Sequence, residues 1–202
     1  MKKYLPKGFT MIELLIVIAV LGVLAIAVLA AINPIEQINR GRDTGSRSDA
    51  EQLLSAIDRY NASQMIWPWQ GAADDTDIVP WTQITALAPA APAVSGGCPM
   101  LSSLRHDVSD TACPGTDEVK QSFVNRIVDQ RYNALYIEYG GDAGDSVYVC
   151  FSPQSMSFSQ EAERRCTDMA TNPLAGYPAI ACTACEDLVG ASGTSPDCIC
   201  LP

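Results

Sequence analysis

Cysteines are the most reactive side chains in this 202-residue sequence, which holds eight of them. None occurs before residue 98; they are Cys98, Cys113, Cys150, Cys166, Cys182, Cys185, Cys198 and Cys200. An even number of cysteines in an exported domain indicates a disulfide framework, whose pairing the sequence alone does not choose. The Cys182–Cys185 and Cys198–Cys200 pairs could instead give four thiolates to zinc, but the second spacing is unusual and no histidine lies nearby. We therefore expect four disulfides, no metal and no cofactor.

Glu13 is a carboxylate at the start of a long apolar segment. From Leu14 to Ile32 there are 19 uncharged residues, and three lysines lie among the first seven residues of the chain. A charge within a membrane helix costs free energy, so an acid there suggests a function and a partner. Cleavage after Gly8 would create a cationic α-amine on Phe9, four residues before Glu13. The simpler alternative is that Glu13 extends to the lipid headgroups.

The stretch KGFTMIELLIVIAVLGVLA resembles the prepilin signal of type IV pilins and of the pseudopilins of type II secretion. Gly8, Phe9, Glu13 and the apolar run occur together at the spacing of that family. The resemblance is strong over about residues 2–32 and weaker to about residue 65. Beyond that point the chain resembles no family in particular.

This resemblance implies a structural filament subunit and not an enzyme. A prepilin peptidase would cleave after Gly8, and the methylated Phe9 amine would pair with Glu13 of a neighbouring subunit. The implied partners are copies of this chain or related pilins, the peptidase, the filament assembly machinery and the cytoplasmic membrane. The chain would be a single-pass membrane protein with its C-terminal domain outside the cytoplasm, and later part of a cell-surface filament. A secretion pseudopilin, or a signal-anchored ectodomain that does not polymerise, are the alternatives.

Catalytic and nucleic-acid-binding patterns are not found in the sequence. Its one histidine, His106, lies in a polar stretch, and there is no GxSxG motif, Walker loop or dinucleotide fingerprint. The formal charge is −10 and becomes −13 once the three leader lysines are removed, whereas nucleic-acid binding needs a basic surface. The acidic residues at 74–77 and 142–145 could bind calcium, but they match no defined loop pattern, and we interpret them as solvated turns.

Two helices should position the N-terminal residues. A helix of 19 uncharged residues is about 28 Å long, close to the thickness of the hydrocarbon core, and the lysines favour a cytoplasmic N-terminus. Pro34 should interrupt this helix. Apolar residues at helical spacing predict a second, amphipathic helix at about 46–63, with Gly41 and Gly45 in a flexible joint or melted segment before it.

The exported domain should contain a β-hairpin at 132–152, because apolar residues alternate on both sides of a glycine-rich turn. Two strands alone are marginal, so a third strand or the docked helix must cover one face. A short polar helix is expected at 159–170. The three tryptophans, Trp67, Trp69 and Trp81, are expected to cap a small core, with a sugar-binding patch as the alternative.

The expected fold class is α+β, with a long N-terminal hydrophobic helix followed by a small disulfide-rich globular domain that contains an antiparallel β-sheet. The expected parts are a basic leader at 1–8, a transmembrane and filament-core helix at 9–33, an amphipathic stem helix at 34–65 and an acidic, cysteine-rich exported domain at 66–202.

Overall fold

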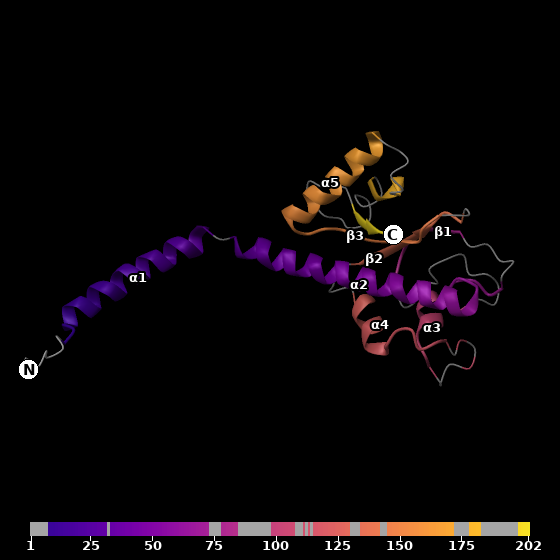
Figure 1. Ribbon diagram of the computed structural model, residues 1–202, viewed down its shortest axis with the longest axis horizontal. Helices are drawn as coiled ribbons and strands as arrows, with labels where there is room; N and C mark the ends of the chain where they lie inside the picture. The colour runs from indigo at the N-terminus through magenta and orange to yellow at the C-terminus, as the bar shows by residue number, and fades with distance from the viewer. Residues whose placement is uncertain are drawn as a thin grey trace, which may run out of the picture. The chain divides into compact units, whose positions relative to one another are not determined.

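A computed structural model describes most of the chain. The described residues are 8–31, 33–72, 78–84, 98–107, 111, 113, 115–129, 134–141, 145–171, 178–182 and 198–202. They confirm the α+β class (Figure 1), with two compact units, Met1–Ile38 and Asn39–Pro202. In chain order the elements are α1 (Met11–Ala31), α2 (Pro34–Gln64), β1 (Val79–Gln83), α3 (Met100–Leu104), α4 (Gln121–Ile127), β2 (Leu135–Tyr139), β3 (Tyr148–Phe151), α5 (Met156–Thr171), the 3-10 helix η2 (Ala179–Cys182) and β4 (Ile199–Leu201).

The predicted interruption at Pro34 is confirmed, because α1 ends at Ala31 and α2 begins at Pro34. The Oδ1 atom of Asn33 accepts hydrogen bonds from the backbone N–H groups of Ile35, at 3.2 Å, and Glu36, at 3.4 Å. Asparagine is a favoured N-cap, and proline suits the first helical position because the backbone N–H that it lacks would be unpaired there. α2 is therefore a helix with its own start.

The predicted joint or melted segment around Gly41 and Gly45 is wrong, because α2 is one helix of 31 residues that runs through both glycines. Polar residues between and just after the glycines make specific contacts within the domain. Asp43 is fully buried and accepts hydrogen bonds from Ser155, and Arg47 forms a 2.6 Å ion pair with Glu161. These contacts outweigh the helix cost of about 1 kcal/mol for each glycine.

The predicted hairpin is confirmed, with β2 and β3 pairing antiparallel in a register that sets Leu135 opposite Phe151 and Glu138 opposite Tyr148. β1 pairs with the other edge of β2, and β4 pairs with the other edge of β3, both antiparallel. The sheet therefore has the order β1-β2-β3-β4. The two flanking strands supply the pairing partners that an isolated hairpin lacks.

The main core lies between the sheet and the helices. Its larger fully buried side chains come from α2, α3, β2, β3 and β4, and include Leu53, Ile57, Leu104, Ile137, Phe151 and Ile199. Two of the tryptophans belong to this core, as expected: Trp69 is 2% exposed, and the rings of Trp67 and Trp69 stack 5.3 Å apart. On the other sheet face Trp81 stacks on Tyr136, with 5.3 Å between the ring centroids.

Disulfides cross-link the domain formed from Asn39 onward. The bonded pairs are Cys98–Cys113, Cys150–Cys200 and Cys166–Cys182. Cys198 is also disulfide-bonded, and Cys185 lies outside the described residues. The zinc alternative is wrong, since three of its four proposed ligands, Cys182, Cys198 and Cys200, are oxidised.

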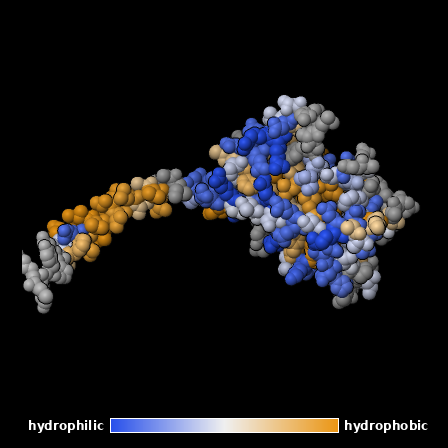
Figure 2. All heavy atoms as spheres, viewed as in Figure 1, coloured by the Kyte–Doolittle hydropathy of each residue, from blue (hydrophilic) through white to orange (hydrophobic). Residues whose placement is uncertain are grey.

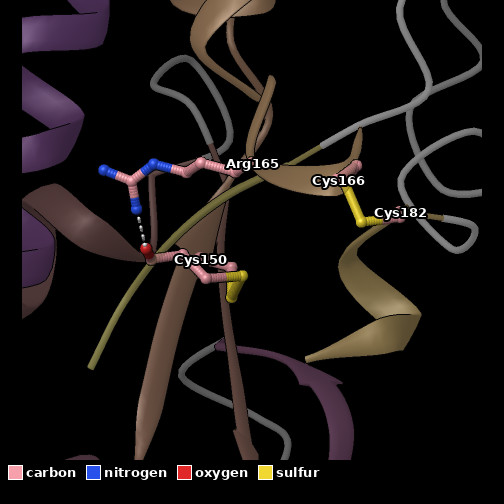
Figure 3. The surroundings of a disulfide bond; sticks show 5 residues. Cys150, Arg165, Cys166 and Cys182 are labelled. Atoms are coloured by element: carbon pink, nitrogen blue, oxygen red, sulfur yellow. Dashed lines mark hydrogen bonds between the residues drawn. A yellow bond between two sulfur atoms is a disulfide. The ribbon is translucent and has the colours of Figure 1, made fainter. Parts of the chain in front are cut away.

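The predicted polar helix is present as α5, Met156–Thr171. Cys166 ties α5 to η2 through its bond to Cys182, and Arg165 donates a 2.9 Å hydrogen bond to the backbone oxygen of Cys200 in β4 (Figure 3). α5 is thus bonded both to η2 and to β4. Of the acidic residues for which we considered calcium, those at 74–77 and Asp142 lie outside the described residues, and Asp145 is described and exposed.

Candidate processing and assembly site

Helix α1 exposes its apolar surface from Met11 to Leu29. The 19 residues from Met11 to Leu29 are long and apolar enough to cross a membrane, and no part of them is buried within this chain. Figure 2 shows this helix as a mainly hydrophobic surface with a hydrophilic patch near its N-terminal end. Water is a poor environment for so much apolar area, so α1 requires lipid or other protein helices around it.

The start of α1 is defined by a reciprocal pair of contacts between Thr10 and Glu13. The backbone N–H and the hydroxyl of Thr10 donate to Oε2 of Glu13, at 2.9 and 2.8 Å, and the backbone N–H of Glu13 donates to the Thr10 hydroxyl at 3.2 Å. This is a capping box, in which N-cap and third helical residue satisfy each other's free donors. The contacts fix the Glu13 carboxylate at the N-terminus of the helix, where the helix dipole favours a negative charge.

Thr10 is a residue of this candidate site that our reasoning from the sequence missed. The signal was present, because a threonine followed three residues later by a glutamate, just before an apolar run, is the sequence pattern of a capping box. From the sequence we considered the lipid headgroups or an amine of another subunit as the partner of Glu13. The structure shows in addition a partner within the same chain, Thr10, which orients the carboxylate.

Gly8 and Phe9 precede the helix and are exposed, Phe9 by 82%. A Cβ added at Gly8 would meet no atom within 4 Å. The fold of this chain therefore does not require a glycine there, and any requirement for one must come from a molecule that binds the junction. Phe9, Thr10 and Glu13 lie together at one end of α1, whereas the described cysteines belong to the domain formed from Asn39 onward.

Groups that could support catalysis are not assembled in the described part of the chain. His106 is exposed, and the neighbouring Asp107 forms a 3.1 Å ion pair with Arg105. No cluster of three or more histidine, cysteine or acidic side chains that could hold a metal occurs among the described residues. The N-terminal segment is thus the strongest candidate for a functional site.

Comparison with known proteins agrees with this choice. A family model described as the prokaryotic N-terminal methylation motif matches residues 6–29. The fimbrial protein EcpC of Eikenella corrodens is 36% identical over 73 residues, which cover 36% of this chain and 46% of that protein. No solved structure matches the chain significantly. The matches confirm the prepilin-type N-terminus and are consistent with the type IV pilin family, although the alignment spans less than half of the fimbrial relative.

Proposed function

We propose that this chain is a structural subunit of an extracellular filament of the type IV pilus kind, cleaved after Gly8 and assembled through α1. The observation that carries the proposal is the position of Glu13. Its carboxylate is held by Thr10 at the start of an apolar helix that has no partner of its own within the described chain. A lone membrane anchor requires the helix but has no need of the acid.

Before assembly, α1 spans the cytoplasmic membrane and the domain from Asn39 onward lies outside the cytoplasm. The formation of disulfides by all the described cysteines supports this side of the membrane, because cytoplasmic thiols are kept reduced. Cleavage by a prepilin peptidase removes the basic leader and leaves Phe9 as the first residue. Its α-amine then lies one helical turn from Glu13.

In the filament, the helices leave the lipid and pack on one another, with the acidic domains outside. An ionised Glu13 buried among apolar helices needs a cation, because an uncompensated buried charge costs several kcal/mol. The Phe9 amine of a neighbouring subunit supplies that cation. The pair sets the axial offset between subunits at about four residues, or roughly 6 Å of helix.

The mass of the mature N-terminal peptide tests the proposal. The expected peptide begins at Phe9 and carries one additional methyl group, and a strain lacking its prepilin peptidase serves as the control. An intact peptide from Met1 would contradict the proposal and favour a signal-anchored ectodomain. A secretion pseudopilin would be processed in the same way, so surface filaments sheared from the native host distinguish the pilus subunit from it.

A further inference from the structure

Three side chains lie in a row across the sheet face that turns away from the main core. Tyr136 and Glu138 are two apart on β2, so they share this face, and the register sets Glu138 directly opposite Tyr148 of β3. On the other side of β2, the strand β1 brings Trp81 onto the same face, where its ring stacks on Tyr136. We call Trp81, Glu138 and Tyr148 the aromatic–acid row.

The aromatic–acid row is partly open to solvent and has a rigid base. Tyr136 is 2% exposed and packs in a small cluster with Cys150 and Cys200, whose disulfide joins β3 to β4. All three residues of the row are partly exposed. A ligand can therefore approach the row from outside, while the cluster beneath it holds the side chains in place.

Two polar atoms of the row are buried without a partner. Nε1 of Trp81 and Oε2 of Glu138 make no hydrogen bond in the described part of the chain. Buried polar groups in native proteins nearly always have a partner, so both atoms need an explanation. An indole N–H can only donate, and an ionised carboxylate can only accept, whereas a hydroxyl group can do both. The missing partner is therefore a molecule that carries hydroxyl groups.

The rings that flank the carboxylate narrow the choice of ligand to a saccharide. A sugar ring combines hydroxyl groups with an apolar C–H face, which packs against the negative face of an aromatic ring. Burial mainly, and then the charges of Asp145 and Glu138, raise the pKa of the Tyr148 hydroxyl, which agrees with a ring close to the carboxylate. A quaternary ammonium ion would suit the rings and the acid, but it offers the indole N–H no acceptor.

We propose that the aromatic–acid row binds a saccharide, whose ring packs on Trp81 and Tyr148 and whose hydroxyl groups accept from the indole N–H and donate to Glu138. The proposal does not depend on filament assembly, because all three residues belong to the unit Asn39–Pro202. The buried residues of α2 pack in the main core, on the opposite face of the sheet, so they leave the row uncovered.

Saturation-transfer difference NMR tests the site on the full chain. The chain is solubilised in a polyoxyethylene detergent, because a detergent with a sugar headgroup would compete for the site. Short oligomers of glucose, galactose and N-acetylglucosamine are the probes, each added separately. We expect at least one of them to receive magnetisation on the C–H protons of one ring face.

Substitutions then place the bound sugar on the row. Trp81→Phe keeps an aromatic ring but removes the N–H, and Glu138→Ala removes the carboxylate. Each should weaken binding at least about tenfold, because each deletes a hydrogen bond to the ligand. Glu138→Ala should leave the domain folded, since the atom that it removes from the buried site has no partner there. Glu163→Ala is the matched control, because Glu163 is an exposed acid on α5 and should not alter binding.

Three results would overturn the inference. If none of the three probes binds, ordered water is the only partner of the two buried atoms. If binding is unchanged in both Trp81→Phe and Glu138→Ala, the sugar lies elsewhere on the chain. If tetramethylammonium binds in a Glu138-dependent way and no sugar does, the row is a cation site. None of these results bears on the proposed filament, which the mature N-terminal peptide tests separately.

Discussion

The carboxylate of Asp43 accepts two hydrogen bonds from Ser155, one from its backbone N–H at 2.8 Å and one from its hydroxyl at 2.6 Å. The backbone N–H of Gln154 donates to the same carboxylate at 2.9 Å. Ser155 directly precedes α5, and its hydroxyl also accepts from the backbone N–H of Phe158. One fully buried acid of the stem helix therefore holds the N-terminus of α5 in place.

Replacing Asp43 should destabilise the domain. In Asp43→Ala two backbone N–H groups lose their acceptor in a buried site, and we expect the free energy of unfolding to fall by about 3 kcal/mol. The matched control is Asp58→Ala, because Asp58 is an exposed acid on the same helix and should change stability little. Urea denaturation of the detergent-solubilised chain measures both. Equal effects of the two substitutions would mean that the buried contact contributes nothing specific.

This contact also shows what could be predicted from the sequence and what could not. α1 and Glu13 were predictable because a membrane span imposes a long apolar run, and the hairpin was predictable because strands alternate. The unbroken course of α2 through Gly41 and Gly45 was not predictable, since Asp43 and Ser155 are separated by 112 positions and no local pattern reports such a contact. β4 has three residues and little periodicity, and its place at the sheet edge depends on Cys200, whose partner the sequence left open.

Loss of the bond between Cys150 and Cys200 should be more damaging than loss of the bond between Cys98 and Cys113. The two bonds close loops of 50 and 15 residues, and a disulfide that closes a longer loop restricts the unfolded chain more. We expect paired serine variants to lose 2–5 kcal/mol, with roughly 1 kcal/mol more for the longer loop. Unfolding in urea gives this comparison. An equal or smaller loss for the longer loop would argue against the loop-entropy explanation.

Peptide mapping without reductant completes the disulfide prediction. Cys198 is bonded, and Cys185 is the one cysteine of the sequence that the described residues do not include. We expect a peptide that joins Cys185 to Cys198 and no thiol that reacts in the native protein. A stoichiometrically reactive thiol would contradict the four-bridge framework.

The stability of the domain should depend on pH through Glu138. Burial raises the pKa of the Glu138 carboxyl, and its Oε2 atom is buried with no hydrogen-bond partner in the described part of the chain. A raised folded-state pKa means that ionisation costs more in the folded than in the unfolded state. This destabilisation is absent below the ordinary value of 4.5 and grows as pH rises from there through the folded-state pKa. Glu138→Gln should remove it, so the variant should gain stability relative to wild type as pH rises.

Glu161 provides a control, because its pKa is shifted in the opposite direction to that of Glu138. Partial burial alone would raise its pKa, but hydrogen bonds and charges from Arg47 and then Arg165 outweigh burial and lower the pKa of the Glu161 carboxyl. The stability that the ionised Glu161 contributes to the fold is therefore present above about pH 4.5 and is lost as pH falls below that value. Glu161→Gln should lose stability relative to wild type near neutral pH and approach it in acid. Parallel pH profiles for the two glutamine variants would contradict both assignments.

Substitution of Gly8 should affect processing and not folding. Because an added Cβ meets nothing within 4 Å, Gly8→Val should leave the rest of the chain unchanged. A peptidase that approaches the backbone closely at this junction would be obstructed by the larger side chain, and the precursor should accumulate in the membrane. Gly22→Val is a useful comparison, since a Cβ at Gly22 also meets nothing within 4 Å and the residue lies away from the junction. Normal cleavage of Gly8→Val in the native host would refute the proposed cleavage site.

The last prediction separates the two partners of Glu13. In the membrane-anchored subunit its carboxylate is held by Thr10, and in the proposed filament it also pairs with the Phe9 amine of a neighbour. Glu13→Ala should leave membrane insertion and leader cleavage largely intact, because removal of a charge eases insertion. Filament yield should fall sharply, since the buried amine of the neighbour would have no counter-ion.

Thr10→Val keeps the charge but removes the orienting hydroxyl, so its filament yield should lie between those of wild type and Glu13→Ala. Thr10→Ser restores a capping hydroxyl and should recover most of the yield. The membrane pool and the sheared filaments are measured separately for each variant. Wild-type filament yield from Glu13→Ala would show that the carboxylate only caps its own helix, and the proposed pairing between subunits would be wrong.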